Sequence, residues 1–229
     1  MQHRCGGTLI KDQWILTAAH CFDDREELAA SGYGVRVGSF DISSDRGRKF
    51  RIDHIIIHSD YGKTGFYKDD IALVHITPIG PKTAADITAP IPTISARQPQ
   101  NGDTVRVTGW GRYDEGDERG PRARLMTDTL TVLGETTCRS KEQYRSTMKV
   151  HEKIFCATSR KASTCKGDSG GPVTSAEAPY VLLGIVSWGK KECDPEFDRP
   201  GVYTDVSDYK RWIENARQSN PQKLISFFK

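Results

Sequence analysis

The sequence lacks the long apolar runs that would place it in a membrane. A spanning helix needs about 20 apolar residues, and the longest uncharged stretch, residues 178–189, has the length of a strand. An excess of either charge is also missing, because 33 Lys and Arg residues are balanced by 30 Asp and Glu residues in a chain of 229. With 36% hydrophobic residues and 21 glycines, the composition is that of a globular protein. We therefore expect a folded chain with no nucleic acid or membrane partner.

Closely spaced metal-binding pairs are nearly absent as well. No Cys-x-x-Cys occurs, and the one His-x3-His pair, His54 and His58, lies in an apolar run. We therefore expect no metal ion and no cofactor. The even number of cysteines favours paired disulfides and an oxidising compartment, although spacing alone does not give the pairing. The six are Cys5, Cys21, Cys138, Cys156, Cys165 and Cys193.

Short apolar runs separated by Gly, Pro, Asp and Asn predict an all-β chain. One clear amphipathic helix is expected over Ser207–Arg217, capped by Ser207, and a weaker one over Glu135–Tyr144. The proline-containing segment 87–101 indicates a linker between two β halves. The expected strands are Gly7–Ile10, Trp14–Thr17, Tyr33–Gly38, Arg51–His58, Ala72–Ile76, Asp103–Gly109, Thr127–Leu133, Pro172–Val173, Val181–Trp188 and Gly201–Asp205.

The segment Cys165-Lys-Gly-Asp-Ser-Gly-Gly-Pro172 carries the most chemical information. Glycines at positions 167, 170 and 171 surround Ser169. A nucleophilic serine needs tightly crowded backbone with N–H groups turned toward the oxyanion, and glycine permits both. The motif alone is equally consistent with a glycine-rich turn around a bystander serine, so a base must also be found.

His20 is the histidine best placed to act as that base. It follows a short apolar run, in Leu16-Thr-Ala-Ala-His-Cys21, where small neighbours leave room for an imidazole to face a cleft. A base of this kind needs a carboxylate to orient it. Asp70 leads directly into the apolar run Ile-Ala-Leu-Val, and a carboxylate there needs a partner. Spacing alone does not choose between Asp70 and its neighbour Asp69.

Five segments together resemble the motifs of the trypsin/chymotrypsin-like serine proteases. The histidine, aspartate and serine motifs occur in the chain order of that family. The family places its aspartate immediately before Ile-Ala-Leu, which selects Asp70 over Asp69. The resemblance covers nearly the whole chain and rests on Thr17-Ala-Ala-His20-Cys21, Asp70-Ile-Ala-Leu, Gly167-Asp-Ser169-Gly-Gly-Pro172, Ser187-Trp-Gly189 and Pro200-Gly-Val-Tyr203.

The resemblance implies two antiparallel six-stranded β-barrels, the first of them incomplete, followed by a C-terminal helix. Residues 1–217 would form one peptidase domain. Its first barrel would cover about 1–90, the linker about 91–101, the second barrel about 102–206 and the helix 207–217, with a tail at 218–229. The active site would lie between the barrels.

The resemblance also implies a role for each site residue. His20 would act as the general base, Asp70 would orient it, and Ser169 would be the nucleophile of an acyl-enzyme mechanism. The N–H groups of Gly167 and Ser169 would form the oxyanion hole. Ser187 and Trp188 would bind the substrate backbone. The implied disulfides are Cys5–Cys21, Cys138–Cys156 and Cys165–Cys193.

The specificity pocket departs from that of a trypsin. By resemblance its floor is Ser163 and its walls are Gly189 and Gly201. A serine at the floor does not neutralise a buried Arg or Lys, and glycine walls leave room for large side chains. We therefore expect cleavage after large apolar or aromatic residues. The acidic segment 190–199 lies beside this pocket.

The start of the chain departs from the family in a second way. Met1 stands four residues before Cys5, and neither an apolar signal segment nor an Ile-Val-Gly-Gly-like activation sequence is present. We expect the chain as written to be poorly active, and a latent, protease-like binding module is the alternative function. The disulfides and the family predict a secreted, monomeric protein. Its expected partners are protein or peptide substrates and protein protease inhibitors.

Overall fold

The first half of the chain forms an open, antiparallel five-stranded sheet. The computed structural model describes residues 3–11, 13–23, 34–44, 46–63, 67–79, 91–112, 122–140, 153–159, 164–189 and 200–218. The strands pair in the order β1-β2-β5-β4-β3, so β1 and β3 are the edges of this sheet among the described residues. Their bounds are β1 Thr8–Lys11, β2 Trp14–Thr17, β3 Gly34–Val37, β4 Arg48–Ile57 and β5 Ala72–Pro78, with a 3-10 helix η1 at Ala19–Phe22.

The second half forms a closed barrel. Six strands pair in a ring in the order β7-β8-β9-β12-β11-β10, and β10 pairs back onto β7. A further short strand, β6, pairs with β11 in parallel. The bounds are β6 Thr93–Ile94, β7 Thr104–Gly109, β8 Met126–Leu133, β9 Ile154–Thr158, β10 Pro172–Ser175, β11 Val181–Trp188 and β12 Gly201–Asp205.

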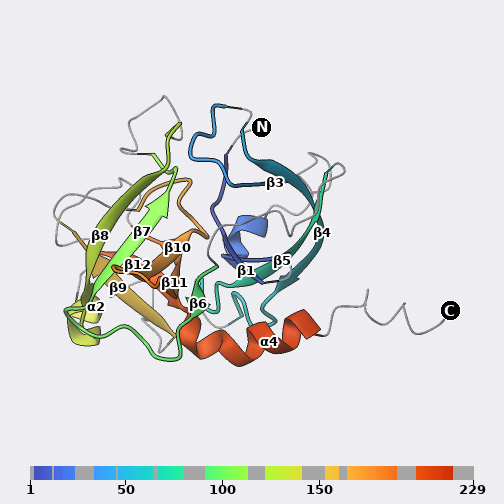
Figure 1. The fold of residues 1–229 in the computed structure, drawn as a ribbon. Coiled ribbons are helices and arrows are strands. Elements are labelled where there is room, and N and C mark those ends of the chain that lie inside the picture. Colours follow the sequence, from blue (N-terminus) through green and yellow to red (C-terminus); the bar gives the residue numbers. More distant parts are fainter. Residues whose placement is uncertain are drawn as a thin grey trace.

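Three helical segments accompany the second sheet. They are α2 Glu135–Ser140, the 3-10 helix η3 Val206–Tyr209 and α4 Lys210–Gln218. In Figure 1 the last of them, α4, lies across the base of both sheets. Its buried residue Ile213 belongs to a cluster shared with strands of both halves. The cluster also contains Ile10, Trp14, Leu16, Ala18, Ile71, Leu73, Leu182, Ile185, Val206 and Tyr209.

The prediction of an all-β chain with two barrels, the first incomplete, is confirmed. Two strands were not predicted. Ile154–Thr158 is buried at every position and so shows no alternation, and Thr93–Ile94 lies inside the expected linker. No helix among the described residues is long and apolar enough to cross a membrane.

The predicted C-terminal helix needs a correction at its start. The segment begins as the 3-10 turn η3, and the α-helix itself starts at Lys210. Ser207 is not the cap, because the Asp205 carboxylate accepts the hydrogen bond from the Ser207 N–H. Of the weaker predicted helix, Glu135–Ser140 is helical and residues 141–150 lie outside the described part.

Candidate active site

His20 and Asp70 lie in direct contact between the two sheets. The His20 Nδ1 atom is 2.8 Å from Asp70 Oδ2, and the His20 backbone N–H donates to Asp70 Oδ1 at 2.9 Å. Asp70 is 1% exposed, and the His20 side chain is 14% exposed. Because Nδ1 points to the carboxylate, the other ring nitrogen, Nε2, is free to exchange a proton with a substrate-bound group.

The local sequence explains why these side chains meet. The buried strand β2 ends at Thr17 and is followed by Ala18 and Ala19, both fully buried. These small residues allow the chain to turn into η1, which carries His20. Asp70 stands two residues before β5, and β5 pairs directly with β2.

Asp70 shifts the protonation equilibrium of His20. Burial alone lowers the pKa of an imidazole, but the hydrogen bond and the charge of Asp70, with a contribution from Asp23, raise the His20 pKa above its ordinary value of 6.5. The Asp70 carboxylate therefore favours the imidazolium that forms when His20 takes up a proton during a reaction.

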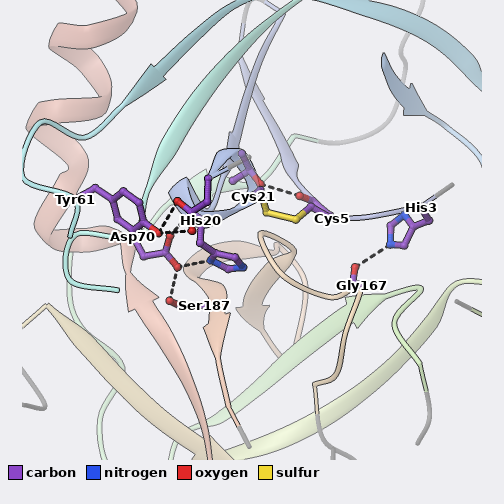
Figure 2. Close-up of a disulfide and its surroundings, with 11 residues drawn as sticks. His3, Cys5, His20, Cys21, Tyr61, Asp70, Gly167 and Ser187 are labelled. Atoms are coloured by element: carbon purple, nitrogen blue, oxygen red, sulfur yellow. Dashed lines mark hydrogen bonds and ion pairs between the residues drawn. A yellow bond between two sulfur atoms is a disulfide. The ribbon is translucent and has the colours of Figure 1, made fainter. Parts of the chain in front are cut away.

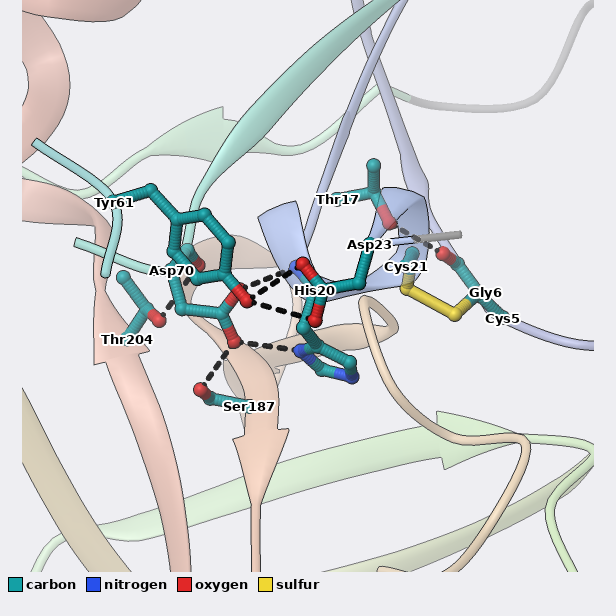
Figure 3. A network of polar contacts seen from close by, with 10 residues as sticks. All are labelled: Cys5, Gly6, Thr17, His20, Cys21, Asp23, Tyr61, Asp70, Ser187 and Thr204. Carbon is teal, nitrogen blue, oxygen red and sulfur yellow. Dashed lines mark hydrogen bonds and ion pairs between the residues drawn. A yellow bond between two sulfur atoms is a disulfide. The ribbon is translucent and has the colours of Figure 1, made fainter. Parts of the chain in front are cut away.

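Two hydroxyl groups from the second barrel hold Asp70 in place. The Ser187 Oγ, on β11, donates to Asp70 Oδ2 at 2.5 Å, and the Thr204 Oγ1, on β12, donates to the Asp70 backbone carbonyl at 3.0 Å. Figure 3 shows Asp70 at the centre of these contacts, with His20 on its other side. Ser187 was predicted to bind the substrate backbone. The structure turns its side chain to Asp70, a contact that the sequence did not reveal.

Ser169 lies on a tight loop with unused hydrogen-bonding groups. The N–H groups of Asp168, Gly170 and Gly171 donate to backbone carbonyls. Those of Gly167 and Ser169 donate to no other described residue, and neither does the Ser169 hydroxyl. Since buried backbone donors are normally paired, two unused N–H groups on the same tight loop are suited to bind a developing oxyanion.

Glycines bring the Ser169 loop into contact with the first sheet. The Gly6 N–H donates to the Ser169 carbonyl at 2.7 Å. Gly170 has a φ of +77°, and a side chain there would overlap Thr17 and the Gly6 carbonyl. Thr17 in turn donates from Oγ1 to the Gly6 carbonyl at 2.9 Å. The loop that carries Ser169 is therefore seated against the strand that leads to His20.

Asp168, the residue directly before Ser169, lies partly buried in this loop. Its carboxylate accepts hydrogen bonds from the N–H groups of Gly111 (2.8 Å) and Cys165 (3.0 Å), and no described Lys or Arg forms an ion pair with it. Burial raises the pKa of Asp168, and the two N–H groups and the nearby charge of His3 only partly oppose this shift.

His3 and the Cys5–Cys21 disulfide border the same loop. The His3 Nε2 lies 2.8 Å from the Gly167 carbonyl. Figure 2 shows the disulfide between this contact and the His20–Asp70 pair. A second disulfide joins Cys138 to Cys156. Cys165 is also disulfide-bonded, and Cys193, the partner that the resemblance implies, lies outside the described residues.

Three residues next to His20 were missed by sequence reasoning. The Tyr67 ring lies 5.0 Å from the His20 ring, and the Tyr61 hydroxyl donates to the Asp23 carboxylate at 3.1 Å. Asp23 follows η1 directly, so its position three residues after His20 was a usable signal. Tyr67 has a φ of +52° next to an undescribed segment, and no periodic pattern marks it.

The predicted pocket is described only in part. Gly189 and Gly201 lie across from each other, since a Cβ on Gly189 would stand 3.8 Å from the Gly201 Cα. A side chain on Gly201 would overlap the Tyr203 hydroxyl, which lies 3.3 Å from Thr164 Oγ1. Trp188, at the end of β11, pairs with Val202 on β12. Ser163, the expected floor, lies outside the described residues.

One group in the described part of the chain has His, Cys, Asp or Glu side chains close enough to share a metal ion. It consists of Cys5, His20 and Cys21. The two sulfur atoms are bonded to each other, and His20 Nδ1 is engaged by Asp70. This group therefore has no thiolates to offer a metal ion.

Comparisons with known proteins identify the class of this fold and site. The Trypsin family model matches residues 1–213. A trypsin of Tyrophagus putrescentiae is 32% identical over 227 residues, which cover 98% of this chain and 75% of that protein. Human transmembrane protease serine 7 is 32% identical over 217 residues, but the chain spans only 24% of its length.

A solved structure shows the same architecture. Neuropsin, described as a serine protease expressed in the limbic system of mouse brain, matches with a TM-score of 0.76 and 28% identity, over 93% of this chain and 88% of that one. The chain therefore has a chymotrypsin-like fold and belongs to the trypsin family of serine proteases.

Proposed function

We propose that this chain is a serine endopeptidase that hydrolyses peptide bonds through an acyl-enzyme on Ser169. One observation carries the proposal. A histidine oriented by a buried carboxylate faces a glycine loop in which the serine hydroxyl and two N–H groups have no other described partner. A structural serine turn needs neither an oriented base nor unused donors.

The reaction would proceed in two halves. The Ser169 oxygen attacks the peptide carbonyl carbon while His20 Nε2 takes the hydroxyl proton. His20 then gives this proton to the leaving amine as the C–N bond breaks, which leaves the acyl-enzyme. Water attacks the ester with His20 again as the base, and Ser169 is restored. Asp70 keeps Nδ1 protonated and pointing away from the substrate throughout.

The N–H groups of Gly167 and Ser169 are proposed as the oxyanion hole. A negative charge forms on the carbonyl oxygen during both attacks, and two preorganised donors stabilise it. In other enzymes the loss of one such donor lowers turnover by about 10²–10³. The tight seating of the loop against Gly6 and Thr17 supports a fixed position for both donors.

The first experiment uses a fluorophosphonate that labels activated serines. We expect it to modify Ser169 in a folded, activated form of the protein, and Ser169→Ala to abolish the labelling. Ser175→Ala is the matched control, since Ser175 lies in the second barrel and bonds within its own turn. Labelling at another serine in a folded sample would show that the assignment of Ser169 is wrong.

For the specificity of this endopeptidase we propose large apolar or aromatic side chains before the scissile bond. By resemblance, glycine walls at Gly189 and Gly201 leave the pocket open to such a side chain, whose burial contributes about 25 cal/mol per Å². Ser163→Asp is expected to move preference toward Arg and Lys. The measurement is kcat/KM for peptides that differ only at that residue, and a wild-type preference for Arg or Lys contradicts the proposed floor.

A second candidate function is a latent, protease-like binding module. Two observations favour it. The partly buried Asp168 carboxylate forms no ion pair with a described Lys or Arg, and the Ser169 hydroxyl has no hydrogen bond to His20. A chain that folds, escapes phosphonate labelling and still binds a protein protease inhibitor supports this alternative. Labelling at Ser169 excludes it.

The proposed activity also indicates a setting for the protein. Its substrates would be proteins or peptides, and protein protease inhibitors would be further partners. We propose a secreted monomer, because the disulfides need an oxidising compartment. Reducing agent is expected to lower the thermal midpoint, since removing a native disulfide from a small secreted domain typically costs about 2–5 kcal/mol.

A further inference from the structure

Asp69 is a buried carboxylate with an unusual backbone conformation. It is 2% exposed and has a φ of +54°, one of three non-glycine residues with positive φ in the described part of the chain. This conformation is disfavoured for residues with a Cβ, although Asp and Asn adopt it more readily than most. A buried charge in such a conformation persists only where neighbouring groups hold it.

The groups that hold Asp69 come from the other half of the molecule. Lys153, immediately before β9, places its Nζ 2.8 Å from Asp69 Oδ1, and the Tyr209 hydroxyl, at the end of η3, donates to the same oxygen at 2.8 Å. The Lys153 ammonium also lies 5.0 Å from the centre of the Tyr209 ring. The Lys153 carbonyl is itself fixed by the Asp205 N–H at 3.0 Å.

His58 completes the surroundings of this cluster from the first sheet. Its ring packs against Tyr209 at 5.4 Å and Trp212 at 5.1 Å. The His58 Nδ1 accepts a hydrogen bond from the Asp60 N–H, and burial lowers the His58 pKa. Burial thus favours the neutral form of His58, and Lys153 is the cation paired with Asp69.

The conformation of Asp69 determines where the next residue points. The Ile71 N–H donates to the Asp69 carbonyl at 2.9 Å, which closes a three-residue turn with Asp70 at its centre. Rotation at Asp69 would swing this turn and move the Asp70 carboxylate away from His20, which it contacts at 2.8 Å.

We propose that Asp69 is a positioning residue whose contacts with Lys153 and Tyr209 lock the turn that aims Asp70 at His20. This inference rests on the proposed function only in taking the aligned His20 to act as the catalytic base. These contacts of Asp69 with Lys153 and Tyr209, which we call the Asp69 clamp, also hold the two halves in register. Lys153 directly precedes β9 and Tyr209 lies in η3, both in the second half of the chain, whereas Asp69 lies just before β5 in the first. A merely stabilising ion pair would leave the alignment unchanged.

Three variants separate the parts of the clamp. Asp69→Gly keeps the left-handed backbone available but removes the carboxylate. Lys153→Met removes the cation from a side chain of similar length, and Lys153→Arg restores a cation. The matched controls are Lys63→Met, which removes an exposed ion pair with Asp60, and Ile76→Val, which weakens the first-sheet core away from Asp70.

The main readout is His20 itself, measured by NMR without any substrate. The proton on His20 Nδ1 is expected far downfield in the wild type because it is shared with a buried carboxylate, and its loss in His20→Ala assigns it. In Asp69→Gly and Lys153→Met we expect this signal to shift or disappear. We also expect the His20 pKa to fall by about 0.5–1 in these variants, because the Asp70 carboxylate no longer lies close to the imidazole. An opposite charge within about 4–6 Å can raise the pKa of a histidine by about 1–3. Lys153→Arg should restore both.

The second readout is the phosphonate labelling rate, which should fall about tenfold or more in the same two variants. The proposal is wrong if Asp69→Gly and Lys153→Met lower the unfolding midpoint but leave the His20 signal and pKa as in wild type. It is also wrong if Ile76→Val, at an equal loss of stability, reproduces their effect on His20. A wild-type chain that shows the His20 signal but never labels contradicts the proposed function and leaves the clamp in place.

Discussion

The second barrel closes on itself where β10 pairs with both β7 and β11, whereas the first sheet ends at the edges β1 and β3 among the described residues. The closed barrel carries the Ser169 loop. The open sheet carries His20 and Asp70, and besides His20 itself the groups that hold Asp70 are hydroxyls of the closed barrel, from Ser187 and Thr204. The open sheet thus depends on hydroxyls of the closed barrel to align Asp70 with His20.

The largest effect is expected when one site residue is removed from each half. Ser169→Ala and His20→Ala should each lower kcat by roughly a millionfold, because the residues act as a unit. The double variant should lose little more than either single one. Measured as a double-mutant cycle on a peptide ester, additive losses would show that the two halves act independently.

Hydrogen exchange tests the difference in closure directly. Every residue of β12 is buried between β9 and β11, whereas β3 is a half-buried edge. Amides of Gly201–Asp205 should exchange near the rate of global unfolding, and those of Gly34–Val37 on the order of a hundredfold faster or more. The measurement is native-state exchange by mass spectrometry or NMR. Equal protection of the two strands would contradict the comparison.

Ser187→Ala breaks one contact between the two halves. A hydrogen bond to a charged group contributes about 1.5–3 kcal/mol, so we expect the phosphonate labelling rate to fall roughly 10- to 100-fold. The control is Ser95→Ala, since Ser95 is also buried but bonds within its own turn, to the Arg97 carbonyl. If both variants behave alike, the contact with Asp70 has no special role.

Asp23→Asn should have the smallest effect, because Asp23 is exposed and water and salt screen its charge. Asp23 raises the His20 pKa, so its removal should lower that pKa slightly. Since only neutral His20 accepts a proton, the acid limb of the pH–rate profile should move to lower pH by the same amount. The difference should shrink in high salt. Asp60→Asn, which does not act on His20, is the control.

The same linkage affects stability. Because the His20 pKa is higher in the folded than in the unfolded chain, its protonation stabilises the fold below about pH 6.5. This contribution is lost as the pH rises through the folded value. As the pH rises from about 6.5 through the folded-state pKa of His20, the thermal midpoint of the wild type should therefore fall more than that of His20→Gln.

Much of this architecture could be predicted from the sequence. Trp14–Thr17, Val181–Trp188 and Gly201–Asp205 have the predicted bounds, because each is a compact apolar run between turn residues. The strand Thr93–Ile94 could not be predicted, since two residues carry no pattern and only the pairing with β11 makes them a strand.

The site could be predicted less completely than the fold. The motifs predicted His20 and Asp70 as site residues, and the structure places them in contact. The role of Ser187 could not be found, because a hydroxyl at the end of an apolar strand has no sequence signature for its partner. Asp69 was considered only as a rival to Asp70. Its contact with Lys153, 84 positions away, exists only after both sheets are assembled.

The shared cluster beneath both sheets has a consequence for biosynthesis. Leu16 and Leu73 of the first sheet pack with Tyr209 and Ile213, which are translated well over a hundred residues later. During synthesis the early strands emerge before the side chains that cover them have been made. Until then part of their apolar face stays exposed, and chaperones can bind it. The first sheet therefore cannot be fully covered until α4, which carries Ile213, has been made.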